Sequence, residues 1–126
     1  MSVRRTTPQQ LARTALLILT SITGLGACDG ETPREGLYYW GAEVHVICRC
    51  GRDLCFWVRG EPEVVEPLKQ YVQKQTDRPY QPVHILYRGH ELDEPTAGFA
   101  ASYDGYEAVV EVLSLTAELP EHCPAP

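Results

Sequence analysis

The sequence predicts a mainly β fold, a small barrel of about five strands with one helix, preceded by an N-terminal signal helix. Two observations lead to this fold class. Short runs of β-branched and aromatic residues are separated by turn residues, which is typical of strands. A single apolar stripe has the spacing of a helix. The length of 126 residues is enough for one domain and no more.

The first three predicted strands lie early in the chain. Residues 37–40 and 42–48 are rich in aromatic and β-branched residues, and Val44 and Val46 alternate onto one face. Residues 50–53 have turn chemistry, and 54–58 form an apolar return strand. We therefore expect 42–48 and 54–58 to form a hairpin.

A helix and two further strands follow. We expect the helix to begin at Glu66 or Pro67, because proline fits best in a first turn, and to end before residue 77. Residues 83–88 and 106–115 are the later strands, separated by a long loop. The apolar stripe of the helix consists of Val64, Val65, Leu68, Tyr71 and Val72.

The N-terminus has the features of an export signal. Residues 1–10 contain Arg4 and Arg5 and no acidic residue, and residues 14–25 are mostly apolar. An apolar run of about a dozen residues is too short to span a membrane, which takes about 20. A basic start followed by a short apolar segment is instead typical of a secretory signal peptide.

The end of this signal resembles the lipobox of bacterial lipoproteins. Leu25, Gly26 and Ala27 precede Cys28 in the order of that motif. The resemblance implies cleavage after Ala27 and a diacylglycerol on the sulfur of Cys28. The predicted organisation is thus a lipoprotein signal peptide at 1–27, a flexible tether at 28–35 and a folded domain at 36–126.

The predicted location is the cell membrane, lipid-anchored on its periplasmic face. An Asp directly after the lipidated cysteine, here Asp29, is associated in enteric lipoproteins with retention at the inner membrane. We therefore expect the inner membrane, with the outer membrane as the alternative.

The charge of the mature chain argues against nucleic-acid binding. The whole sequence has 11 basic and 17 acidic residues, and cleavage after Ala27 removes Arg4, Arg5 and Arg13. Eight basic residues then face 17 acidic ones, a formal charge of −9. Nucleic-acid binders normally have a basic surface. The expected partners are the membrane, through the lipid anchor, and an envelope protein.

Four cysteines remain in the mature chain, and two interpretations of them are open. An even number in an oxidising compartment indicates two disulfides. Alternatively, Cys48, Cys50 and Cys55 are close enough in sequence to bind copper or zinc as thiolates, with His45 nearby. The fourth cysteine is Cys123.

The order of these features resembles the C-terminal domain of the NlpE family of envelope lipoproteins. The matching positions are Glu43-Val44 through Cys50-Gly51, Phe56-Trp57-Val58, Leu68, Tyr71, Pro82-Val83-His84-Ile85, Gly89 and Cys123. The resemblance implies a partly open, OB-like barrel and a part in envelope stress or surface sensing. The N-terminal barrel of that family, which carries a Cys-x-x-Cys motif linked to copper, has no counterpart here, so no copper role is expected from the family.

The resemblance also implies a disulfide pairing. It matches Cys50 with the terminal Cys123, which leaves Cys48 to pair with Cys55. Turn geometry offers the rival pairs Cys50–Cys55 and Cys48–Cys123. The sequence leaves both open.

No catalytic motif is present. The chain contains no Gly-x-Ser-x-Gly, phosphate loop or nucleotide fingerprint, and no spacing brings the carboxylates of Glu43 and Glu107 together. We therefore expect no enzyme and no cofactor. The expected function is a non-catalytic binding or structural domain, with metal handling by the cysteine cluster as the alternative.

Two other groups of residues carry weaker predictions. His84 and His90 flank one strand end near Glu91 and Asp93, which suggests a metal or pH-sensing patch. The aromatic residues are expected in the core, with contact to a peptide or a glycan as the alternative; they are Tyr38, Tyr39, Trp40, Trp57, Tyr80, Tyr87, Tyr103 and Tyr106.

Overall fold

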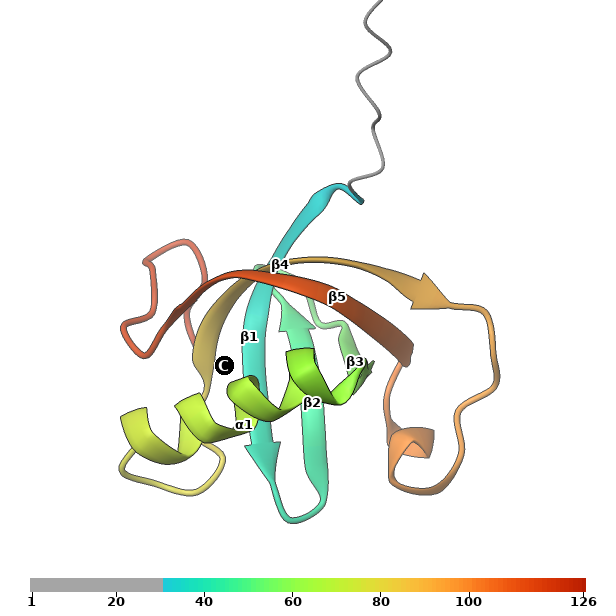
Figure 1. Ribbon diagram of the computed structural model, residues 1–126, viewed down its shortest axis with the longest axis horizontal. Coiled ribbons are helices and arrows are strands. Elements are labelled where there is room, and N and C mark those ends of the chain that lie inside the picture. The colour runs from blue at the N-terminus through green and yellow to red at the C-terminus, as the bar shows by residue number, and fades with distance from the viewer. Residues whose placement is uncertain (1–30) are drawn as a thin grey trace, which may run out of the picture.

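The computed structural model describes residues 31–126, which form a barrel of five strands with one α-helix (Figure 1). The mainly β fold class is therefore confirmed. The predicted signal peptide at 1–27, Cys28 and Asp29 lie outside the described residues. The elements are β1 (Pro33–Gly41), β2 (Val44–Arg49), β3 (Cys55–Arg59), α1 (Pro62–Gln75), β4 (Val83–Leu92), the short 3-10 helix η1 (Gly98–Ser102) and β5 (Gly105–Thr116).

The strands close into a ring in the order β1-β2-β3-β5-β4. Four of the five neighbouring pairs are antiparallel, and β3 pairs with β5 in parallel. This order, with the helix between β3 and β4, is that of an OB-like barrel. The barrel is closed rather than partly open because every strand pairs with two others: β1 pairs with β4 through residues 33–38 and with β2 through residues 36–41, and β5 pairs with both β3 and β4.

The first strand begins earlier than the sequence predicts. Pro33, Arg34 and Glu35, assigned above to the tether, belong to β1 and pair with β4. A proline is tolerated as the first residue of a strand, where its missing N–H breaks no ladder. The folded domain therefore starts at residue 33, and the side chains of Arg34 and Glu35 become available to two polar clusters.

The helix also begins earlier than expected. α1 starts at Pro62, which occupies the first turn, and Pro67 lies inside the helix. An interior proline removes one backbone hydrogen bond. The early start nevertheless buries Val65, which joins Leu68 and Val72 in the core.

Two later elements are longer than predicted. β4 continues to Leu92, into the residues expected to form a loop, and its register with β5 shifts twice along the way. β5 extends from Gly105 to Thr116. Residues 83–88 of β4 pair with β1, and the added residues 89–92 pair with β5 alone.

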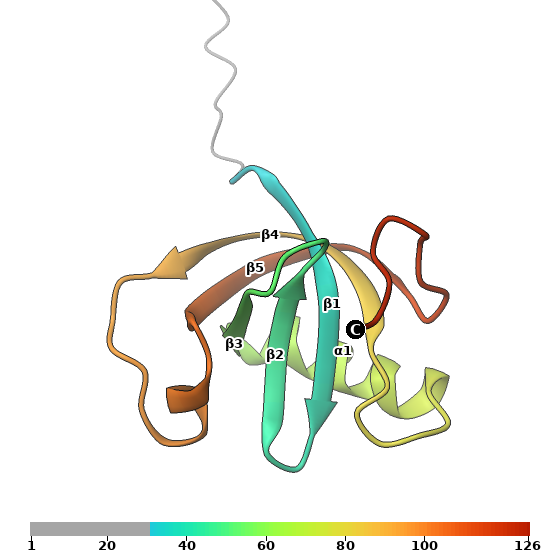
Figure 2. The same cartoon turned by 180° about the vertical axis from the view of Figure 1, so that it is seen from behind.

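The core fills the barrel and extends under the helix. Buried residues from all five strands and from α1 form one cluster: Tyr38, Ile47, Val58, Val65, Leu68, Val72, Val83, Ile85, Tyr87 and Val109. Trp40 and Val72 line one cavity, which places α1 at the Gly41 end of β1. In both views the β4–β5 loop with η1 and the segment after β5 lie on opposite sides of the barrel (Figure 2).

Candidate functional site

An aromatic cluster lies where the β4–β5 loop passes over β3. Trp57 of β3 stacks against Phe99 of η1, with ring centroids 6.4 Å apart and planes inclined by 20°. Tyr103 contacts the same indole, with centroids 5.8 Å apart. Phe99 is 60% exposed, the most exposed of the large hydrophobic residues described, so the cluster forms part of the surface. We call Trp57, Phe99 and Tyr103 the aromatic face.

Backbone hydrogen bonds hold the loop in this position. The amide of Asp104 donates to the carbonyl of Cys55 (2.8 Å), and the amide of Cys55 donates to the Asp104 carboxylate (2.8 Å). Nearer η1, the Ala97 amide donates to the Tyr106 hydroxyl (3.2 Å). Gly98 has a φ of 59°, a left-handed conformation that favours glycine and turns the chain into η1. The aromatic face is therefore held at both ends of the loop.

The aromatic face lies where OB-like barrels bind their ligands. OB-like barrels bind oligonucleotides and oligosaccharides on their second and third strands and on the loop between the fourth and fifth. A stacked aromatic surface accepts a nucleobase, or the C–H face of a sugar whose hydrogens meet the negative face of the ring. The net charge of −6 for the whole chain opposes binding to a polyanion.

The sequence predicts only part of this face. Trp57 and Tyr103 are among the aromatic residues for which ligand contact is the alternative to core packing, but Phe99 is not. Phe99 lies between Gly98 and Ala100, outside any alternating strand pattern. The signal that could have identified Phe99 is that it is an aromatic residue within a predicted loop.

The four cysteines form two disulfides. Cys48 pairs with Cys55 and Cys50 with Cys123, with Cα–Cα distances of 4.0 and 4.7 Å. These are the pairs implied by the family resemblance, and the rival pairing does not form. In the first, the two cysteines face each other across the β2–β3 hairpin.

These disulfides also bear on the predicted cysteine metal cluster. The sulfurs of Cys48, Cys50 and Cys55 are bonded in the structure and offer no thiolate. His45 packs instead against the rings of Tyr38 and Trp57, with centroids 5.7 and 6.2 Å away. Burial, followed by the charge of Lys69, lowers the pKa of His45 to about 4. The four residues therefore do not meet as a metal site in this oxidation state.

A buried carboxylate sits inside the barrel at the end of β1 away from Gly41. Glu107 is fully buried and accepts hydrogen bonds from Arg34 (3.1 Å), Arg49 (3.1 Å) and the Tyr87 hydroxyl (2.9 Å). Burial, and then the charge of Glu107, raises the pKa of Tyr87. These donors neutralise the carboxylate and satisfy its oxygens, which a buried ion requires.

The predicted carboxylate pair does not form. Glu43 is exposed in the turn that joins β1 to β2, beyond the Gly41 end of β1, whereas Glu107 is held near Arg34. Arg49 also pairs with Glu91 (3.1 Å), an exposed residue at the rim of the network. Sequence reasoning gave no signal for this arrangement, since Glu107 is one of 17 acidic residues.

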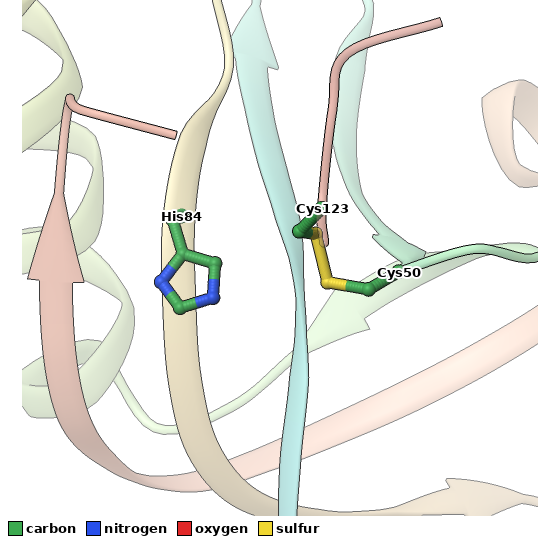
Figure 3. A group of neighbouring side chains, drawn as sticks. All are labelled: Cys50, His84 and Cys123. Atoms are coloured by element: carbon green, nitrogen blue, oxygen red, sulfur yellow. A yellow bond between two sulfur atoms is a disulfide. The ribbon is translucent and has the colours of Figure 1, made fainter. Parts of the chain in front are cut away.

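A second polar cluster lies on the outside of the barrel. One oxygen of Glu35 accepts hydrogen bonds from the Nε2 atoms of His84 (2.6 Å) and His122 (2.5 Å). These bonds, that of His122 first, lower the pKa of Glu35. The ring of His84 also lies beside the Cys50–Cys123 disulfide (Figure 3).

The predicted histidine patch is divided in the structure. His90 bonds to Glu31 (2.5 Å), whereas His84 bonds to Glu35, so the two histidines have different partners. Both register shifts between β4 and β5 fall between these two histidines, and His84 belongs to the group with His122. The carboxylates of Glu91 and Asp93 contact neither ring within hydrogen-bond distance among the described contacts.

No protein-family model, curated protein or solved structure matches this chain. Among residues 31–126, no helix is long and apolar enough to cross a membrane.

Proposed function

We propose that this chain is a lipid-anchored envelope protein whose OB-like barrel binds a glycan strand without catalysis. Cys28, outside the described residues, carries the lipid in this proposal, and the barrel faces the periplasm. The ligand lies across the aromatic face of Trp57, Phe99 and Tyr103.

The exposed stack of Phe99 on Trp57 carries the proposal. A single exposed hydrophobic side chain is common, but contiguous apolar surface marks interaction sites, and this phenyl ring stacks on a half-buried indole. Both rings lie on the strand and loop that OB-like barrels use for ligands. Because the chain is acidic, a sugar strand fits this surface better than a nucleic acid does.

The lipobox and the resemblance to the NlpE C-terminal domain support the envelope location. A barrel anchored at its N-terminus reaches the glycan network only as far as its tether allows. Asp29 favours the inner membrane. Binding of an envelope glycan there is compatible with the sensing role that the resemblance implies, since a sensor must contact the structure it monitors.

Binding to isolated cell-wall glycan tests the proposal. The processed lipoprotein in detergent micelles is expected to sediment with purified peptidoglycan sacculi. A soluble tetramer of N-acetylglucosamine should change its tryptophan fluorescence, because Trp57 is one of two tryptophans. Stacking of a nucleobase on one aromatic ring contributes about 1–3 kcal/mol, and we expect a sugar to reach the lower part of that range, so Phe99→Ala should weaken binding about tenfold.

Val110→Ala is the matched control. Val110 is 54% exposed on β5, outside the aromatic face, so its truncation should leave binding unchanged. Absence of binding by the wild-type protein would refute the proposal, as would equal losses in both variants. Preference for single-stranded DNA over the sugar would point to a nucleic-acid ligand and refute it as well.

A further inference from the structure

Three ligand-bearing side chains from distant parts of the sequence converge beside the Cys50–Cys123 disulfide. Glu35 comes from β1, His84 from β4, and His122 from the segment after β5. One ligand atom from each lies within 4.8 Å of the other two. The two Nε2 atoms approach the same carboxylate oxygen, at 2.6 and 2.5 Å.

The fold positions each of these residues. β1 and β4 are paired with Leu37 opposite His84 and Glu35 opposite Leu86, so Glu35 and His84 are diagonal neighbours on one face of the sheet. Cys123 is fully buried and bonded to Cys50, which fixes its neighbour His122 above that face. The disulfide therefore brings the third residue to the other two.

We propose that Glu35, His84 and His122 form a binding site for a divalent transition-metal ion, for which zinc is the probe. Zinc is held in proteins by imidazole nitrogen and carboxylate oxygen, and two histidines with one glutamate are a known set that leaves a position for water. Imidazole ligands also suit copper, nickel and iron. The site is separate from the aromatic face, and it lies beside the Cys50–Cys123 disulfide without using a cysteine as a ligand.

The distances allow the ion to enter with small movements. Ligand atoms about 2.0–2.2 Å from a tetrahedral zinc lie about 3.4 Å from one another, so each contact must lengthen by about 1 Å. His122 can make this adjustment because its side chain is 63% exposed. His84 is nearly buried and provides the fixed ligand. The exposed side of His122 also leaves room for water as a fourth ligand.

The contact between His90 and Glu31 lacks the third ligand that the proposed site has. His90 and Glu31 are also in contact, at 2.5 Å, but no third histidine, cysteine or carboxylate group completes a cluster with them among the described residues. A pair of this kind is an ordinary surface ion pair. His90 therefore serves as the matched control for His122.

Zinc binding to the processed lipoprotein, measured by competition with a chromophoric chelator, tests the proposal. We expect one zinc ion per chain. Loss of an outer-shell partner alone weakens zinc sites about 10–100-fold, so His122→Gln and Glu35→Gln should each weaken binding by at least about 100-fold. His90→Gln should bind zinc as the wild type does.

Cobalt substitution identifies the ligands independently. A site of two imidazoles and a carboxylate gives cobalt d–d bands without a thiolate charge-transfer band, and His122→Gln should abolish those bands. A thiolate band would assign the metal to reduced cysteines and overturn the proposal. So would the absence of stoichiometric zinc binding, or equal weakening by His90→Gln and His122→Gln. Because His122 is exposed, its replacement tests the ligand rather than the fold.

Discussion

At the scale of single residues, the buried polar groups differ in how they are satisfied. Glu107 has three donors and is fully compensated. The buried Nε2 of His45 has no hydrogen-bond partner. The ring of His45 is adjacent to Tyr38 of β1, and the charges that act on it are those of Lys69 and Glu66 of α1. Among the described residues, the hydroxyls of Tyr38 and Tyr39 and one oxygen of Glu31 are also buried without a partner, but His45 is the one of these whose pKa burial shifts into the mildly acidic range.

The pKa of His45 predicts a loss of stability in mild acid. Its folded-state pKa is about 4, below the ordinary value of 6.5, so protons bind the unfolded chain more tightly. The stability is fully present above pH 6.5 and is lost as the pH falls toward 4. Between pH 8 and 4.5 the free energy of unfolding should fall by about 2–3 kcal/mol from this group.

Chemical denaturation of His45→Phe across this pH range isolates the effect. Phenylalanine keeps a flat ring in the same site and has no group to protonate, so the variant should lose this part of the pH dependence. It should also be at least as stable as the wild type at pH 7, because an unpaired buried polar atom costs about 1–3 kcal/mol. An unchanged slope in the variant would assign the acid sensitivity to other groups.

At the scale of elements, the two disulfides constrain very different lengths of chain. Cys48–Cys55 links two neighbouring strands of one hairpin, seven residues apart. Cys50–Cys123 links the end of that hairpin to the segment after β5, 73 residues away. The short bridge reinforces contacts that β2 and β3 already make, whereas the long one attaches a segment that no strand pairing holds.

The long disulfide should therefore contribute more to stability. By chain entropy, replacing Cys50 and Cys123 with alanine should lower the free energy of unfolding by about 4 kcal/mol. The same change at Cys48 and Cys55 should lower it by about 2.5 kcal/mol. Urea denaturation of the two double variants measures the difference, and a larger loss for the short bridge would contradict it.

At the scale of the whole molecule, the acidic barrel has no electrostatic attraction to anionic lipid. From Cys28 onward the chain has eight basic and 17 acidic residues. Polybasic segments attract proteins to such membranes, and an acidic surface is repelled. In the lipid-anchored protein that we propose, membrane attachment then comes from the acyl chains, each of whose buried methylenes contributes about 0.8 kcal/mol.

Cell fractionation tests this dependence on the anchor. The wild-type protein should stay with the membranes in high salt, because acyl anchoring is not screened. Cys28→Ala should move the protein to the soluble fraction. The double variant Cys50→Ala/Cys123→Ala, which removes cysteines without touching the lipobox, should remain in the membranes. Retention of Cys28→Ala would show that something other than lipid holds the protein there.

Local sequence patterns predicted most of the elements that make up the whole fold. Alternation located the strands, the apolar stripe located the helix, and cysteine parity predicted two disulfides. The starts of β1 and α1 were predicted less accurately. β1 begins at Pro33, which was assigned to the tether, and α1 begins at Pro62, before the expected start at Glu66 or Pro67. Tertiary pairing with β4 extends β1, and burial of Val65 extends α1.

The sequence by itself determined which residues alternate, how many cysteines can pair and which segment resembles an export signal, because these properties depend on neighbours in the chain. Only the tertiary structure decided that the barrel closes, that Glu107 lies inside it, and that Glu35 meets His122. Those two residues are 87 positions apart. Their contact depends on the register between β1 and β4 and on the Cys50–Cys123 disulfide, and neither is encoded by local spacing.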